Sequence, residues 1–187
     1  MSDSDLTLTQ GALFDDPTPS YLIDANCLMR PYNEYYSPDF KLSELFWSRL
    51  FGLIRRGVLG IIDKVRDETY GHASDELDKQ LDAVRALVLV TDNDASILNG
   101  YRQVLSHIAT TPMRYQPKAV RDWTPETVAD PWLLATALAF RSTIVTFETK
   151  PDPAGRPWKR VKIPAVAEDF GIPCMDLFVF MKEVGGF

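Results

Sequence analysis

Two short apolar segments, each ending in an acidic residue, constrain the fold of this chain most. The first is Tyr21–Asp24, and the second, far downstream, is Thr143–Glu148. Short, largely apolar runs with β-branched residues are typical of parallel strands that are buried on both faces. The carboxyl ends of such strands meet at one edge of the sheet, which is where open α/β folds bind ligands. Asp24 and Glu148 are therefore predicted to lie at this edge.

The rest of the chain alternates strand-like and helix-like segments. Two further strands are expected at Leu87–Thr91 and Pro173–Met175. Apolar spacing and capping residues predict helices at about 43–56, at 63–70, from 74, at 94–108, from 130, at 164–170 and at 176–184. This alternation implies right-handed βαβ crossovers and an α/β fold with a central parallel sheet. Residues 1–18 lack clear periodicity and are predicted to form a flexible tail before one domain at 19–187.

Composition narrows the classes of function. The 187 residues are 45% apolar, with no stretch long enough to cross a bilayer and no signal-peptide pattern at the start. Cys27 and Cys174 each lie in or beside an apolar run, so we expect buried free thiols and a cytoplasmic protein. Cys27 and Cys174 lack C-x-x-C spacing, and His72 and His107 cannot build a histidine-rich metal centre. The net charge of −6 argues mildly against a general nucleic-acid binder.

Two more acids extend the set begun by Asp24 and Glu148. Glu68 lies on a predicted helix, and Asp130 lies at the start of another. If Val65 packs inward, Glu68 lies near the same face three residues later, while Asp67 points elsewhere. Carboxylates gathered at one edge repel one another unless a cation lies between them, and oxygen-only ligands suit Mg²⁺ or Mn²⁺. The four acids are therefore candidate metal ligands and catalytic residues of a phosphodiester enzyme.

Each acid also has a plain structural explanation. Asp24 could cap a helix or form an Asx-turn, and Asp130 could cap the helix that it begins. Glu68 could lie on a solvated helix face, and Glu148 could be a surface acid at a strand end. The four acids together indicate a metal site only through their order along the chain: a strand end, a helix, a helix start and the next strand end.

Polar and aromatic residues close to the acids are candidate supporting groups. Asn26 could orient Asp24, and Thr146 could orient a carboxylate or a metal-bound water. Tyr32 and Tyr35 follow Asp24 closely, so they are expected in a loop at the rim of the cleft. There they could stack on bases or anchor the loop to the core.

A basic segment, Thr149–Lys162, begins directly after Glu148 and has a formal charge of +4. Its prolines and Gly155 predict a surface loop. Lys150, Lys159 and Arg160 are candidate substrate-binding residues. The alternative is a solvated loop that balances nearby acids, with Trp158 anchoring it.

These motifs resemble the PIN domain, the nuclease fold of VapC-type toxins in type II toxin–antitoxin systems and of several RNA-processing enzymes. The matching segments are Ile23–Asn26, Val65–Glu68, Ala129–Ala137 and Ile144–Glu148. The last motif is usually Thr-x-Asp and here is Thr-x-Glu. Across residues 20–184 the chain is more closely similar to an uncharacterised prokaryotic PIN-like family.

The resemblance implies a three-layer α/β/α PIN-like fold with about four to five parallel strands. It implies a Mg²⁺- or Mn²⁺-dependent endoribonuclease, an RNA substrate, products with 5′-phosphate and 3′-hydroxyl ends, a cognate antitoxin and commonly a homodimer. Two alternatives stay open. One is a catalytically idle PIN-like module that binds RNA or a protein, and the other is a metal-dependent phosphatase.

Overall fold

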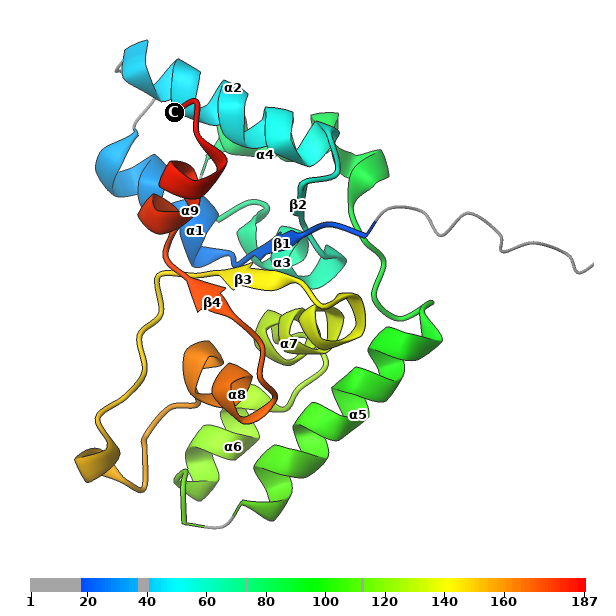
Figure 1. The fold of residues 1–187 in the computed structure, drawn as a ribbon, viewed down its shortest axis with the longest axis vertical. Coiled ribbons are helices and arrows are strands. Elements are labelled where there is room, and N and C mark those ends of the chain that lie inside the picture. The colour runs from blue at the N-terminus through cyan, green and yellow to red at the C-terminus, as the bar shows by residue number, and fades with distance from the viewer. Residues whose placement is uncertain (1–17, 37–40, 73, 112) are drawn as a thin grey trace, which may run out of the picture.

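The computed structural model describes residues 18–36, 41–72, 74–111 and 113–187 (Figure 1). Most of the predicted flexible tail, residues 1–17, lies outside the described residues. The single domain at 19–187 therefore stays a prediction. Within the described ranges, no helix combines the length and the apolar character needed to cross a membrane.

A four-stranded parallel sheet forms the centre, in the order β2-β1-β3-β4. β1 (Tyr21–Ile23) pairs with β2 (Leu59–Gly60) on one side and with β3 (Thr143–Val145) on the other. β3 pairs in turn with β4 (Cys174–Met175). The predicted α/β class with a central parallel sheet is confirmed, and three of the strands lie within the predicted strand segments.

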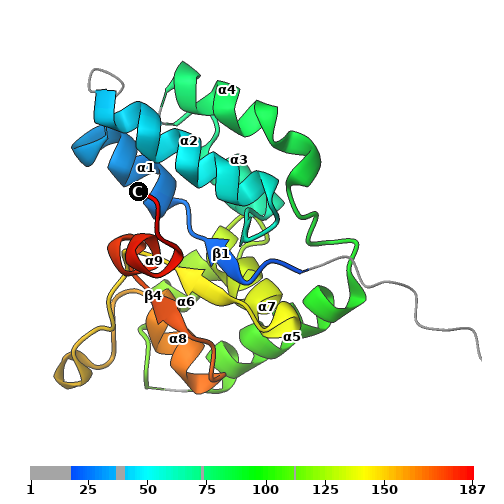
Figure 2. The same ribbon diagram turned by 45° about the horizontal axis from the view of Figure 1, so that its top comes forward.

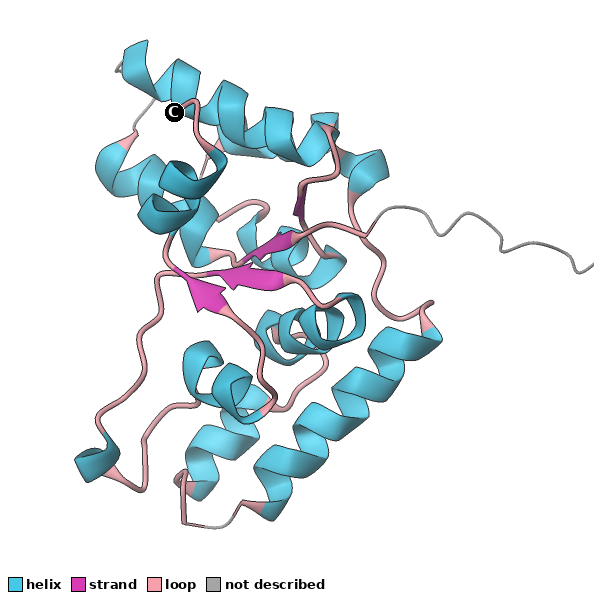
Figure 3. Ribbon diagram, in the orientation of Figure 1, coloured by secondary structure: helices cyan, strands magenta, loops and turns pink. Residues whose placement is uncertain are grey.

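Helices cover both faces of this sheet (Figures 1 and 2). α1, α2 and α9 lie on one side, and α5 to α8 lie on the other, so the fold has three layers. Figure 3 shows how short the strands are beside these helices. The bounds are α1 Asn26–Arg30, the π-helical turn η1 Pro31–Tyr35, α2 Lys41–Arg55, α3 Asp63–Thr69, α4 Asp75–Ala83, the 3₁₀ turn η2 Arg85–Leu87, α5 Ala95–Thr110, α6 Pro117–Trp123, α7 Ala129–Phe140, the 3₁₀ turn η3 Pro153–Gly155, α8 Ile163–Asp169 and α9 Leu177–Val184.

Side-chain caps start three of these helices where the sequence predicts them. The Ser74 hydroxyl accepts the Leu77 N–H at 3.2 Å at the start of α4. Asp94 accepts the first free N–H groups of α5, and Asp176 accepts the Val179 N–H at 2.8 Å in α9. Such caps satisfy backbone donors that have no partner inside the helix.

Several predicted elements are wrong. Leu87–Thr91 is not a strand, because only Leu89 makes an isolated bridge, to Ile62, at the edge of the sheet. The edge strand is instead β2, whose two residues are too short to give a sequence pattern. Tyr32 and Tyr35 lie in the π-helical turn η1, not in a loop, and α6 was not expected.

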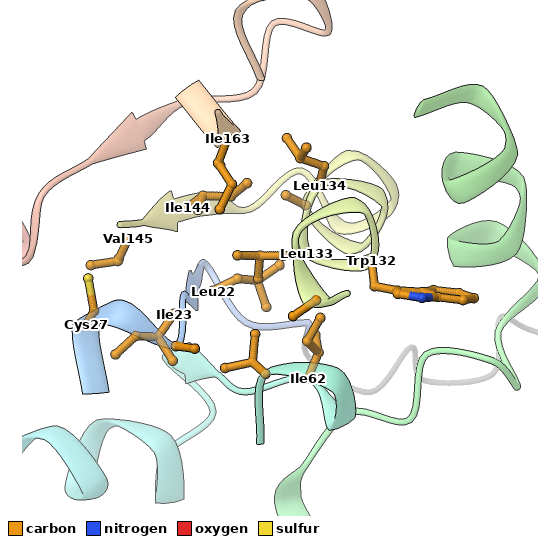
Figure 4. Close-up of a cluster of buried hydrophobic side chains, with 14 of the residues drawn as sticks. Leu22, Ile23, Cys27, Ile62, Trp132, Leu133, Leu134, Ile144, Val145 and Ile163 are labelled. Carbon is orange, nitrogen blue, oxygen red and sulfur yellow. The ribbon is translucent and has the colours of Figure 1, made fainter. Parts of the chain in front are cut away.

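The core is built around α7, which is apolar on nearly every side and almost entirely buried. Figure 4 shows Leu133 and Leu134 of α7 in one cluster with Leu22 and Ile144 of the central strands. Trp132 stacks on Tyr101 of α5, with ring centroids 3.8 Å apart. A helix of this kind is stable only between two other layers, so α7 lies fixed between the sheet and α5.

The contact between α5 and α7 depends on a glycine, which gives a test of the packing. A Cβ on Gly100 would lie 2.9 Å from the Ala135 carbonyl oxygen. We expect Gly100→Ala to destabilise the protein by about 1–3 kcal/mol, as overpacked cores do, as measured by urea unfolding. Gly52→Ala in α2 is the control, since its Cβ would meet only Arg56 at 3.6 Å. It should stabilise the protein by up to about 1 kcal/mol, and an equal effect at both positions would contradict this account of the packing.

Candidate active site

Asp24 lies at the carboxyl end of β1, where the central strands finish. Its N–H donates to the Val145 carbonyl of β3 at 3.0 Å, and its side chain is buried, with the residue 4% exposed. The Thr146 hydroxyl donates to Asp24 Oδ2 at 2.6 Å, and the Asn26 amide donates to the same oxygen. The predicted orienting residues therefore both act on Asp24.

Asn26 and Thr146 also tie the two strand exits together. Asn26 Oδ1 accepts the Phe147 N–H at 3.0 Å, and Thr146 Oγ1 accepts the Glu148 N–H at 3.0 Å. The Thr146 hydroxyl thus accepts the backbone N–H of Glu148 and donates its own hydrogen to the side chain of Asp24. This network fixes where Asp24 and the backbone of Glu148 lie relative to each other.

Asp130 occupies the first turn of α7, but it does not cap the helix. Val128 is the N-cap residue, so the helix begins before the predicted Asp130–Pro131 start. The Asp130 carboxylate instead accepts the indole N–H of Trp123, at the end of α6, at 2.8 Å. The capping explanation for Asp130 is therefore wrong, and its only hydrogen bond among those described comes from another helix.

Asp67 and Glu68 are both exposed on α3, so the explanation of a solvated helix face stays open for Glu68. Asp67 forms an ion pair with Arg66 at 3.4 Å. Glu68 lies three residues after Val65, which is fully buried. Partial desolvation and then the charge of Glu148 raise the pKa of Glu68. Glu68 is thus within electrostatic range of Glu148.

Desolvation and neighbouring charges raise the pKa of both Asp24 and Asp130. Burial, opposed by the Thr146 hydrogen bond and reinforced by the charges of Glu148 and Glu68, raises the pKa of Asp24 to about 7. Burial and then the charges of Asp24 and Glu148 raise the pKa of Asp130 to about 8. Asp24 and Asp130 therefore both lie within electrostatic range of Glu148 and Glu68.

Glu148 differs from the other three acids because it has a cationic partner. Its Oε1 forms an ion pair with Lys162, and its Oε2 accepts the Ile163 N–H at the start of α8 at 2.8 Å. Within the part of the chain that the structure describes, Asp24, Glu68 and Asp130 form no ion pair with Lys, Arg or His. Three of the four carboxylates therefore lack an ion-pair partner, although the charge of His72 opposes the rise in the pKa of Glu68.

The four acids fit a hard divalent cation in chemistry, because all their donor atoms are oxygens. Asp24 is also buried without a cation, which is costly unless a positive charge is supplied. Among the described residues, however, no three His, Cys, Asp or Glu side chains are close enough to hold a metal ion as they stand. A metal would have to draw these side chains together.

A pocket of about 290 Å³ joins the acids to the basic segment. Asp130 and Glu148 line it together with Lys159, Arg160 and Lys162. The three cations also line a second pocket of about 530 Å³, which contains Arg156 and Trp158. The predicted nearness of basic segment and acids is therefore observed. Trp158 is buried and donates its indole N–H to the Asp152 carbonyl at 2.7 Å, so it anchors the loop.

Other predicted binding residues lie apart from this pocket. Tyr32 packs against Trp47, with ring centroids 5.9 Å apart, and lines a pocket with residues of α2 and α4. The half-exposed Tyr35 packs edge-on against Phe178 of α9 at 5.9 Å. Lys150 forms an ion pair with Glu168 at 2.7 Å, and both line a pocket with Thr146 and Glu148. Their roles in substrate binding stay predictions.

Sequence reasoning missed two residues that contact the acids, Trp123 and Lys162. Trp123 ends a helix that was not expected, so nothing in the sequence indicated that its indole contacts Asp130. Lys162 was counted only as one charge of the basic segment. Its position directly before α8 was the available signal, since Glu148 contacts both Lys162 and the first residue of that helix.

Comparisons with known proteins give a family and a distant structural likeness. A family model described as "Domain of unknown function (DUF4411)" matches residues 21–186. No curated protein matches the chain. Among solved structures, a chain of the VapBC2 complex from Rickettsia felis bound to a DNA fragment from its promoter is 12% identical, with a TM-score of 0.46. The match covers 83% of this chain and 97% of that one.

The raised pKa values predict how stability depends on pH without metal. Asp24 and Asp130 bind protons more tightly in the folded protein than at their ordinary value of 3.8. The stability that they contribute is present below pH 4 and is lost as pH rises through about 7 and 8. In EDTA, the free energy of unfolding should therefore fall between pH 4 and pH 8, more steeply in the wild type than in Asp24→Asn. If the free energy of unfolding, measured with urea, changed equally with pH in both proteins, the raised pKa of Asp24 would be contradicted.

Proposed function

This chain belongs to the DUF4411 family, and we propose that it is a metal-dependent endoribonuclease with a PIN-like fold. The observation that carries the proposal is that Asp24, buried at the carboxyl end of β1, and Asp130, half-buried in the first turn of α7, form no ion pair among the described residues. A Mg²⁺ or Mn²⁺ ion would supply the missing positive charge.

The acids divide the work of holding such an ion. Hydrogen bonds from Thr146 and Asn26 orient Asp24, and one from Trp123 orients Asp130, as outer-shell partners orient metal ligands. Glu68 on α3 and Glu148 after β3 complete the proposed ligand set. When bound, a divalent ion lowers the pKa of a water molecule and neutralises charge on a scissile phosphate.

The basic segment would hold the substrate. Lys159 and Arg160 are exposed and line the same pocket as Asp130 and Glu148. A phosphate contacted by Lys159 and Arg160 would lie beside the acids. The same two cations line a second pocket together with Arg156, so the positive surface extends away from the acids. The chain is acidic overall, so this local positive charge is what favours binding of an anionic RNA.

The biological role follows from the motif resemblance. We infer that the protein is the toxin of a type II toxin–antitoxin system and that a cognate antitoxin restrains it. Copurification of the product of an adjacent small gene, with loss of cleavage in the complex, is the expected outcome.

One observation favours a second function, that of a catalytically idle PIN-like module that binds RNA or a protein. Glu148 is occupied by Lys162 and Ile163, and the described acids form no ready-made group of three ligands. An idle module would bind RNA with the same affinity in EDTA and in Mn²⁺, and it would leave the RNA intact.

Cleavage of a labelled single-stranded RNA tests the enzyme. The wild type should cleave in Mg²⁺ or Mn²⁺ and stop in EDTA. Asp24→Asn and Asp130→Asn should each reduce the rate by more than about 100-fold, because even the outer-shell partners of a bound metal are worth about 10–100-fold. Wild-type cleavage by either folded variant would contradict the metal-ligand role of that aspartate.

Glu68 has a matched control on the same helix. Glu68→Ala should reduce cleavage, whereas Asp67→Ala removes an exposed carboxylate that is paired with Arg66 and should leave the rate unchanged. The opposite result would assign the α3 ligand to Asp67.

The salt dependence of RNA affinity tests the basic segment. Replacing Lys159 and Arg160 together with alanine should weaken binding and flatten the slope of log affinity against log salt by about 0.7 for each lost phosphate contact. The control replaces Lys79 and Lys118, two exposed lysines paired on other helices. A slope that falls equally in both variants would mean that Lys159 and Arg160 hold no particular phosphate.

A further inference from the structure

A pocket of about 530 Å³ lies in the connection between β3 and α8. Among the described residues that line it, every charged side chain is a cation, and these are Arg156, Lys159, Arg160 and Lys162. Its volume lies in the range of pockets that hold whole small molecules rather than a single ion. Because the chain carries a net charge of −6, this pocket locally reverses the overall sign. It therefore favours an anionic ligand.

The larger pocket shares cations with the smaller one, of about 290 Å³, that holds two of the acids. Lys159, Arg160 and Lys162 line both pockets, whereas Arg156 lines only the larger one. An anionic ligand that contacts the shared cations can therefore continue from the acids to Arg156. A ligand with one phosphate can occupy only one of the two pockets, whereas a nucleic-acid strand has a phosphate for each.

Arg156 is held in place by the anchored tryptophan. Its guanidinium carbon lies 4.8 Å from the centroid of the Trp158 ring, while the residue itself is exposed. The Gln116 amide braces the same turn by donating to the Pro157 carbonyl at 3.3 Å. Within the part of the chain that the structure describes, Arg156 forms no ion pair. A guanidinium that is stacked on a ring and has no carboxylate partner is oriented in advance to bind a phosphate.

Resting on the proposed function, we propose that the larger pocket is a flanking-phosphate subsite for an RNA strand. Arg156 binds the phosphate of a nucleotide next to the one held at the acids. Lys159 and Arg160, which line both pockets, bridge the two phosphates. The protein then prefers a chain with several phosphates to a mononucleotide or another phosphate monoester. This preference counts against the metal-dependent phosphatase that the sequence left open.

A packing role for Arg156 makes a different claim. The guanidinium could simply cover one face of Trp158 and shield it from water. Loss of that cover would lower thermal stability and leave the affinity for RNA unchanged. The number of phosphates that the protein contacts, measured from the salt dependence of binding, therefore separates the two roles.

The experiment measures the affinity of the full chain for a labelled single-stranded RNA against salt concentration, in EDTA so that no cleavage intervenes. Arg156→Gln, which removes the charge but keeps a planar end group, should weaken binding at low salt about tenfold. It should also flatten the slope of log affinity against log salt by about 0.7, the value for one phosphate of a single strand. Arg156→Lys keeps the charge and should restore the slope.

Two controls accompany this measurement. Arg102→Gln is the matched variant, because Arg102 is an exposed arginine on α5 and no residue of that helix lines either pocket. It should leave the affinity and the slope unchanged. Adenosine monophosphate is the second probe, since it carries one phosphate. It should bind the wild type at least about 100-fold more weakly than the RNA, because only a strand engages both pockets at once.

Two outcomes overturn this inference alone. An unchanged slope in folded Arg156→Gln would mean that Arg156 contacts no phosphate and only covers Trp158. Adenosine monophosphate that bound as tightly as the RNA, and was weakened by Arg156→Gln, would mean that the pocket serves a small nucleotide and not a strand. If the folded wild type bound no RNA, in EDTA or in Mn²⁺, the proposed function would fail together with the inference.

Discussion

The hydrogen bond between Thr146 and Asp24 is the interaction on which the site depends. It crosses from the end of β3 to the end of β1, and the Asn26 amide reinforces it from the start of α1. Without these neutral donors, a carboxylate buried beside other acids would be pushed toward protonation or toward solvent. With them, the carboxylate stays at the sheet edge in one orientation.

The remaining acids are placed by packing more than by polar contacts. α7 is fixed between the sheet and α5, and the Gly100–Ala135 approach allows that close contact. Asp130 therefore faces the site because the apolar residues that follow it are buried. α3 is anchored by Val65, which is fully buried, and it carries the exposed Glu68 three residues later. The core thus confines negative charge that the chain only partly compensates.

Sequence reasoning succeeded where the signal is local. Strand segments that end in acids, and Ser74, Asp94 and Asp176 before helices, specify their structure within a few residues. It failed where a partner far along the chain decides. β2 is two residues long and exists because β1 lies beside it. The sequence suggested that Asp130 caps a helix, because its hydrogen bond from the Trp123 indole on another helix leaves no trace in the local pattern.

The anchoring of Trp158 divides the connection between β3 and α8 into two parts. Its backbone N–H donates to the Arg114 carbonyl at 2.9 Å, and its carbonyl accepts the Gln116 N–H at 2.8 Å. Lys159 and Arg160 follow this fixed point and reach α8 within a few residues. The exposed residues 153–157 lie between Trp158 and Asp152, whose carbonyl accepts the Trp158 indole N–H, so changes within this turn need not move those two cations. The outer rim of the pocket can therefore differ while its cationic base stays in register with the acids.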